Sequence, residues 1–224
     1  MFNDKFKKSL LIGSLLLNIL FVLVFIGKRF YYSHYQLFHH VITMDERWAN
    51  YLKSNPAGEV VFLGTSITEG FDVKQEFDSP KVKNMGFAGS ISENGIQVIN
   101  RLIYRKPAKV FIEFGVNDFK YGISEDTVKS HLIRMIDIIK QQSPKTVIFV
   151  QSVFPTDRDS LNNKILSYNK QANEICKQKD VTFLNLYPSF LRGNKIDKDL
   201  TFDGTHFTEA GYFYWRKLIS EVVN

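Results

Sequence analysis

The hydrophobic positions divide the chain into an apolar N-terminal run and a longer segment of alternating short strands and helices. Residues 9–27 read SLLIGSLLLNILFVLVFIG and contain no charged side chain. At about 1.5 Å of rise per residue, a helix of this length reaches roughly 28 Å, close to the hydrocarbon thickness of a bilayer. The pattern therefore predicts a transmembrane helix within residues 1–30.

The flanks of this run favour an uncleaved anchor over a signal peptide. The run is longer than the apolar region of a usual signal peptide, and GKRFYYSHY follows it in place of an A-x-A-like cleavage site. The basic pair and the aromatic residues of that stretch are typical of a membrane interface. Three lysines precede the run, so we expect a single-pass membrane protein whose body lies outside the cytoplasm.

The remaining chain is predicted to form a linker helix over residues 31–55 and one domain over residues 56–224, with a break at Pro56-Ala57-Gly58. Apolar runs predict strands at 59–63, 82–85, 109–114, 146–153 and 181–186. Apolar residues at three- and four-residue spacing predict helices at 124–141, 160–178 and 208–222. This alternation indicates a mostly parallel five-stranded sheet with helices on both faces, an α/β fold.

Charge and cysteine content narrow the choice of function. The net charge is +6, and residues 1–29 supply +4 of it from five basic residues and one acid. A nearly neutral body argues against a nucleic-acid-binding protein. Cys176 is the only cysteine, so the chain has no internal disulfide, and its place in a predicted helix indicates a buried thiol.

Two groups of chemically capable residues follow the predicted strands, where open α/β sheets bind their ligands. Ser66 in GTSIT follows the first strand, and it could be a nucleophile or a helix N-cap. Asp203 and His206 in FDGTHF are three residues apart across a glycine turn. There the carboxylate could fix the imidazole so that its other nitrogen accepts the serine proton, although a solvated turn capping the last helix would look the same.

Donors for a developing oxyanion follow two further strands. Gly89 lies in NMGFAGS after the second strand, where glycine permits close approach of backbone N–H groups, and Gly86 is the lesser candidate. Asn117 in GVND follows the third strand and offers an uncharged amide, although an Asx-turn would explain it equally well. The other four histidines lack metal-ligand spacing, so we expect neither a metal nor a cofactor.

The four segments together resemble the four sequence blocks of the SGNH hydrolase superfamily, the GDSL-type esterases and lipases. The serine, glycine, asparagine and Asp-x-x-His blocks correspond in this order to GTSIT, NMGFAG, GVND and DGTH. The stretch from 161 onward is most similar to the platelet-activating-factor-acetylhydrolase-like branch. The resemblance implies a three-layer α/β/α flavodoxin-like fold and ester hydrolysis. It also implies Ser66 as nucleophile, Asp203 and His206 as its partners, and an oxyanion hole of Ser66, Gly89 and Asn117.

The resemblance leaves the substrate open and departs from the family at one position. The family usually has Asp where this chain has Thr65, which puts loop rigidity in doubt. We expect the substrates to be short-chain esters, above all acetyl esters, of envelope glycans. The alternatives are acyl transfer to a sugar, a lipid esterase, and a catalytically inactive glycan-binding module. Five phenylalanines could line an acyl pocket or belong to the core: Phe71, Phe87, Phe154, Phe202 and Phe207.

Overall fold

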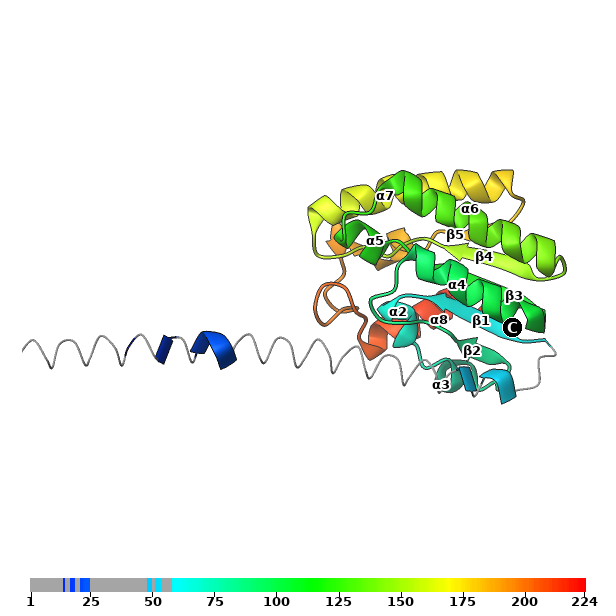
Figure 1. Cartoon of the computed structure of the whole chain (residues 1–224), viewed down its shortest axis with the longest axis horizontal. Helices are drawn as coiled ribbons and strands as arrows, with labels where there is room; N and C mark the ends of the chain where they lie inside the picture. The colour runs from blue at the N-terminus through cyan, green and yellow to red at the C-terminus, as the bar shows by residue number, and fades with distance from the viewer. Residues whose placement is uncertain (1–13, 15–16, 19–20, 25–47, 50, 54–57) are drawn as a thin grey trace, which may run out of the picture. The chain divides into compact units, whose positions relative to one another are not determined.

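The computed structural model describes residues 14, 17–18, 21–24, 48–49, 51–53 and 58–224 (Figure 1). The chain divides into two compact units, Met1–Asn50 and Tyr51–Asn224. Among the described residues, no helix combines the length and the apolar character needed to cross a membrane. The predicted membrane segment and linker helix fall mostly outside the described residues, as does most of the expected break at Pro56-Ala57-Gly58.

Five parallel strands form the central sheet of the second unit. They are β1 (Val60–Gly64), β2 (Val82–Asn84), β3 (Lys109–Glu113), β4 (Val147–Gln151) and β5 (Thr182–Leu184), in the spatial order β2-β1-β3-β4-β5. In register, Phe62 of β1 lies beside Asn84 of β2 and Phe111 of β3. The prediction of five strands is confirmed, and each predicted strand overlaps an observed one.

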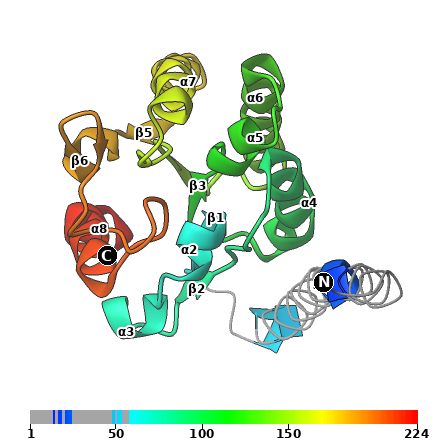
Figure 2. The ribbon, with the colours of Figure 1, turned by 90° about the vertical axis from the view of Figure 1, so that its left-hand side faces the viewer.

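Helices cover both faces of this sheet (Figure 2). α4 (Ser92–Leu102), α6 (Glu125–Gln142) and α7 (Asp159–Gln178) lie on one face, and α3 (Val73–Phe77) and α8 (Glu209–Val223) lie on the other. The short helices α2 (Ser66–Glu69) and α5 (Val116–Lys120) directly follow β1 and β3. Two 3-10 turns, Ile103–Arg105 and Tyr187–Phe190, and a small hairpin of β6 (Leu191–Arg192) and β7 (Lys195–Ile196) complete the unit. The three-layer α/β fold is therefore confirmed.

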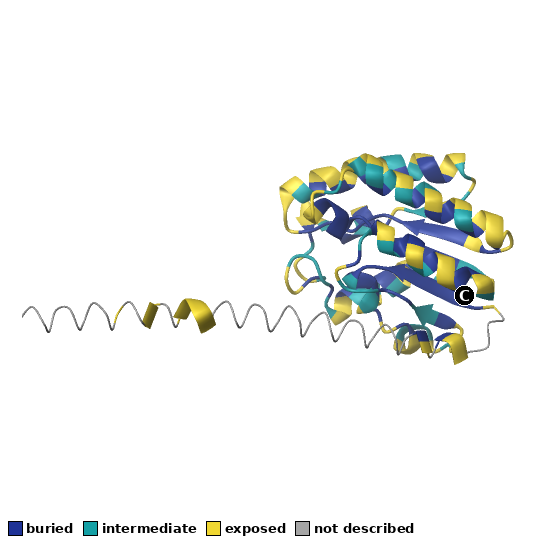
Figure 3. Cartoon of the chain, viewed as in Figure 1, coloured by how far each residue is buried: buried dark blue, intermediate teal, exposed yellow. Residues whose placement is uncertain are grey.

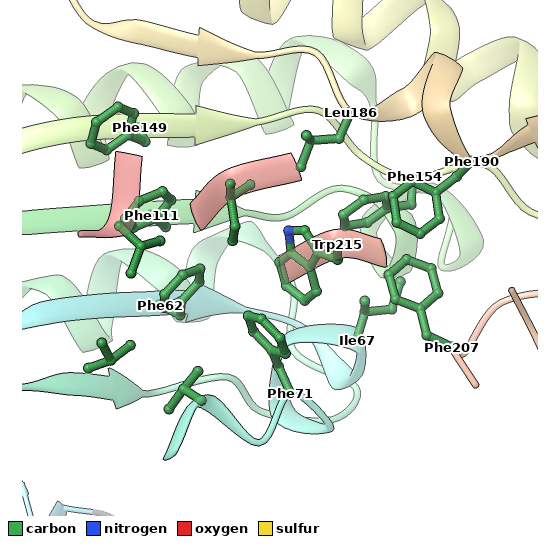
Figure 4. Packing of buried hydrophobic residues seen from close by; sticks show 14 of the residues in the cluster. Phe62, Ile67, Phe71, Phe111, Phe149, Phe154, Leu186, Phe190, Phe207 and Trp215 are labelled. Carbon is green, nitrogen blue, oxygen red and sulfur yellow. The ribbon is translucent and has the colours of Figure 1, made fainter. Parts of the chain in front are cut away.

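The central strands are buried (Figure 3), and aromatic side chains fill the core between the sheet and α8 (Figure 4). The rings of Phe62 and Phe111 stack 4.5 Å apart, and Phe111 stacks on Phe149 at 4.7 Å. Trp215 is fully buried against them, and its indole N–H donates to Gln151 Oε1 at 2.8 Å, which removes the cost of burying it unpaired. The strands are thereby held rigidly at the end where the site lies.

The order of the strands determines where a ligand can bind. The chain steps outward from β1 to β2, and then crosses back to place β3 on the other side of β1. At such a reversal, the loops after the two central strands diverge and leave a crevice at their carboxyl ends. Ser66 follows β1 and Asn117 follows β3, so both lie at this point.

Candidate active site

Ser66 is the first residue of α2, presented by a tight turn at the end of β1. Its hydroxyl oxygen lies 2.9 Å from Nε2 of His206. Gly64 permits the turn, because a Cβ there would collide with the Thr68 side chain and the Glu113 carbonyl. Thr65, not Ser66, occupies the N-cap position of α2, and its side chain makes no capping bond. Ser66 is therefore free of the helix-capping role that its sequence position also allowed.

Asp203 forms a hydrogen bond with the other nitrogen of the His206 ring. Its Oδ2 is 2.6 Å from His206 Nδ1, and its Oδ1 accepts the backbone N–H groups of Thr205 and His206 at 2.9 and 2.8 Å. Partial burial opposes ionisation of Asp203, but the bonds from His206 and Thr205 outweigh it and lower the pKa of this carboxyl. The ionised carboxylate fixes the ring with Nε2 toward Ser66. α8 is capped by Thr208 instead, so this turn does not cap the last helix.

The backbone N–H of Gly89 differs from those of its neighbours in the loop after β2 in its hydrogen bonding. The N–H groups of Gly86, Phe87, Ala88 and Ser90 each donate to a protein oxygen, whereas that of Gly89 donates to none among the described residues. Gly89 has φ +75°, and an added Cβ would have only the Tyr121 hydroxyl near it, at 4.0 Å. Gly86 instead packs directly against the backbone of α2. Gly89 is thus the residue of this loop with a donor available to a ligand.

Asn117 is joined to the same loop. Its Nδ2 donates to the Ser90 carbonyl at 2.9 Å, and the amide is 8% exposed. An amide nitrogen carries two hydrogens, so one remains for a ligand. The Ser90 hydroxyl in turn has two carbonyl acceptors within reach, that of Phe87 at 2.6 Å and that of Gly64 at 3.1 Å. Ser90 therefore connects the segments that carry Ser66, Gly89 and Asn117, and no Asx-turn is needed to explain Asn117.

Two buried carboxyls beneath these loops escaped the sequence analysis. Glu113, at the end of β3, is fully buried and accepts the Thr65 hydroxyl at 3.1 Å, and burial raises its pKa to about 7. Asp118 accepts the Ser92 backbone N–H at 3.0 Å and the Ser92 hydroxyl at 2.6 Å, and burial raises its pKa. The partner of Thr65 thus lies on the neighbouring strand. The available signal was an acidic residue two positions before GVN and another directly after it.

The five candidate acyl-pocket phenylalanines differ in burial: three are buried, Phe87 is half-buried and Phe202 is exposed. Phe71, Phe154 and Phe207 are at most 3% exposed and belong to the aromatic core (Figure 4). Phe202 is 72% exposed, and its ring stacks on His206 with centroids 5.8 Å apart. Tyr121, beside Gly89, is 62% exposed. The site is therefore flanked by exposed aromatic rings, and three of the five phenylalanines are unavailable to line a pocket.

Solved structures share this architecture. The chain matches a lipase/acylhydrolase from Enterococcus faecalis with a TM-score of 0.61 and 25% identity, over 74% of this chain and 95% of the other. A Bacteroides fragilis protein assigned as an acylhydrolase gives 0.71 and 24%, over 79% and 93%. A variant of an acetyl-xylooligosaccharide esterase from Geobacillus gives 0.63 and 17%, over 75% and 94%. The two matches below 25% identity show the fold alone.

Two curated relatives match this chain over only part of their own length. The N-acylneuraminate cytidylyltransferase of Escherichia coli is 31% identical over 174 residues, which are 74% of this chain and 40% of the relative. The corresponding enzyme of Streptococcus agalactiae is 26% identical over 102 residues, 24% of its length. The chain thus spans less than half the length of these relatives.

The parallel sheet carries at its carboxyl end a chain of hydrogen bonds from serine through histidine to aspartate, an arrangement that serine hydrolases of unrelated folds share. The sequence pattern of the GDSL-like lipase/acylhydrolase family matches residues 62–213, and the chain belongs to this family. The predicted resemblance to the GDSL-type esterases and lipases is thereby confirmed.

Proposed function

We propose that this protein is a serine esterase that removes short acyl groups, above all acetyl, from carbohydrate esters. The observation that carries the proposal is the hydrogen-bonded chain from Ser66 through His206 to Asp203. In this scheme His206 accepts the Ser66 proton while the hydroxyl oxygen attacks the ester carbonyl. His206 then returns the proton to the departing alcohol, and water resolves the acyl-enzyme.

Three donors stabilise the tetrahedral oxyanion in this proposal: the backbone N–H groups of Ser66 and Gly89 and the side chain of Asn117. The unpaired N–H of Gly89 and the second amide hydrogen of Asn117 support these roles. Donors fixed before the reaction begins stabilise the charge without reorganising, and each contributes on the order of 10²–10³ in turnover.

A short acyl group and a carbohydrate alcohol are favoured by the surroundings of Ser66. Phe71, Phe154 and Phe207 pack in the core, so these three side chains cannot line a pocket for a long acyl chain. The exposed rings of Phe202 and Tyr121 offer flat apolar surfaces on which a sugar ring can pack. The similar proteins include an acetyl-xylooligosaccharide esterase, and the curated relatives are named for a reaction of N-acylneuraminate, an acylated sugar.

The decisive experiment compares the protein with its Ser66→Ala variant on p-nitrophenyl acetate, butyrate and octanoate. We expect turnover that is greatest on the acetate and that disappears in Ser66→Ala. A matched control is Ser130→Ala, which removes a hydroxyl on the outer side of α6 that bonds only to the Thr127 carbonyl. Activity retained by Ser66→Ala would remove Ser66 as nucleophile, and a preference for octanoate would indicate a lipid esterase.

We further propose that residues 9–27 anchor the protein in a membrane with its catalytic unit outside the cytoplasm. The uncharged run and the basic residues before it support this placement. The test is protease treatment of intact cells that carry the full-length protein. Digestion of the catalytic unit from outside is expected, whereas protection until the cells are lysed would contradict the proposed orientation.

A further inference from the structure

A basic hollow is lined by α5 and the beginning of α7, the segments that follow the carboxyl ends of β3 and β4. Its volume is about 210 Å³. Three of its six lining residues are cations and none is acidic: Phe119, Lys120, Arg158, Ser160, Leu161 and Lys164. Pockets for whole drug-sized ligands span roughly 300–1,000 Å³, so this hollow has room for only part of a substrate.

The cations of this hollow are not neutralised by the residues around them. Neither Lys120 nor Lys164 forms an ion pair with a residue that the structure describes. Arg158 has one acidic neighbour, Asp157, at the long distance of 4.0 Å. Asp159, the other nearby acid, accepts from Asn194 at 2.8 Å and lies 3.6 Å from Lys195. A net positive potential therefore remains over the hollow.

Both walls of the hollow are continuous with the candidate active site. Lys120 lies one turn beyond Asn117 on α5, and the ring of Phe119 packs edge-on against Tyr168 of α7 at 5.5 Å, which fixes α5 against α7. On the other wall, the Asp157 backbone N–H donates to the Gly204 carbonyl at 2.9 Å, within the turn from Asp203 to His206. The hollow and the candidate active site thus share α5 and are joined through the turn at Gly204, so the cations lie at the same end of the sheet as Ser66.

We propose that this hollow binds an anionic group on the alcohol part of the ester, so that the preferred substrates are acyl esters of acidic saccharides. The inference rests on the proposed esterase function and narrows its substrate class. A carboxylate and a phosphate share the required chemistry, since both accept hydrogen bonds from ammonium and guanidinium groups. Lys120, Arg158 and Lys164 would determine specificity and would not touch the reacting atoms.

The test compares two substrates that differ in one group, the monoacetylated methyl glycosides of glucuronic acid and glucose. Each solvent-accessible cation should favour the acid by about two- to fivefold. We therefore expect the intact protein to prefer the glucuronoside by about tenfold or more in kcat/KM, with a smaller preference at 1 M salt. An acetylated glucose 6-phosphate provides the phosphate arm, and whichever anion gives the larger ratio identifies the group recognised.

Variants locate the source of the preference. Arg158→Glu combined with Lys164→Glu should reverse or abolish the ratio between the two glycosides. Lys177→Glu, which reverses one charge near the other end of α7, should leave it unchanged. Equal turnover of both glycosides by the intact protein, turnover of neither, or a preference that survives the double reversal would overturn the proposal.

A binding experiment separates this proposal from the esterase mechanism. In Ser66→Ala protein, methyl glucuronoside should bind more tightly than methyl glucoside in an NMR titration, and the double reversal should remove the difference. Absence of that difference would contradict the anionic subsite even if Ser66 proves to be the nucleophile. Tighter binding of the glucuronoside would support the subsite even if the serine mechanism fails.

Discussion

Replacing Glu113 by glutamine should remove a pH-dependent loss of stability that the intact protein undergoes between about pH 4.5 and pH 7. Glu113 lies at the end of β3 with no exposed surface, and its Oε2 accepts the hydroxyl of Thr65, the residue before Ser66. Its Oε1 has no hydrogen-bond partner among the described residues. Burial without a cation disfavours the charged form, and the nearby Asp118 adds to this effect.

The magnitude follows from the two pKa values of this carboxyl. Burial raises the pKa from an ordinary 4.5 to about 7. Between these values the folded protein retains a proton that the unfolded chain has released, so the free energy of unfolding falls as the pH rises. At 1.36 kcal/mol for each pH unit, the loss amounts to about 3 kcal/mol and is complete above the folded-state pKa. Below pH 4.5 both states are protonated and the full stability is present.

The assay is urea unfolding at half-unit intervals from pH 4 to pH 8.5 for the intact protein and for Glu113→Gln. Glutamine keeps the shape of the side chain and an oxygen for Thr65, but it cannot ionise. The difference in unfolding free energy between the two proteins should therefore shift by about 3 kcal/mol in favour of Glu113→Gln as the pH rises through this window. Contributions from groups present in both proteins cancel in this difference.

Glu93→Gln is the matched control, because Glu93 is exposed on α4 and its replacement should leave the pH dependence of stability intact. A constant difference between Glu113→Gln and the intact protein from pH 4 to pH 8.5 would refute the reasoning, since it would mean that Glu113 ionises equally in both states. A difference that moves in the opposite direction would show that an unrecognised cation stabilises the carboxylate.

Four further outcomes follow from other contacts of the structure. Asn117→Ala should lower kcat by about 10²–10³ by removing an oxyanion donor, and Asp203→Asn by about 10²–10⁴ by misorienting His206; steady-state kinetics on p-nitrophenyl acetate measures both. Gly86→Ala should destabilise the fold by about 1–3 kcal/mol in urea unfolding, because the added Cβ would collide with the backbone behind Ser66. Cys176, 1% exposed and with its pKa raised to about 12 by burial, should react with a thiol reagent only after unfolding; labelling of the native protein would contradict this.

Much of the fold could be predicted because its determinants are local. Continuous apolar runs identified all five strands, and helical spacing placed α6, α7 and α8 to within a residue or two at either end. Local chemistry also begins α6, because the Ser124 hydroxyl caps this helix by accepting the Thr127 N–H at 3.2 Å. The rule that ligands bind at the carboxyl ends of parallel strands then directed attention to the loops of Ser66 and Asn117.

The unpredicted features depend on contacts between distant segments. Glu113 and Thr65 are 48 residues apart, and only the register of β1 beside β3 makes them neighbours. In the sequence, a single acidic residue after an apolar run indicates the end of a strand, and no neighbouring residue indicates that its side chain is buried. The burial of the phenylalanines also depends on distant contacts. Phe202 and Phe207 are five residues apart in sequence, but the packing of α8 buries Phe207 and leaves Phe202 exposed.

Ser90 shows how these distant contacts assemble the site from parts that are individually ordinary. Its hydroxyl bonds to the Gly64 carbonyl and its own carbonyl accepts from Asn117, so the loops after β1, β2 and β3 share one residue. Glu113 binds Thr65 in the loop after β1, and Asp118, which follows β3, binds Ser92 at the end of the loop after β2. A donor array stabilises a transition state only if its members keep their spacing while charge develops. Because the restraints are buried and reach across strands, the position of each donor depends on all three loops, and a change at Ser90 should disturb Ser66, Gly89 and Asn117 together.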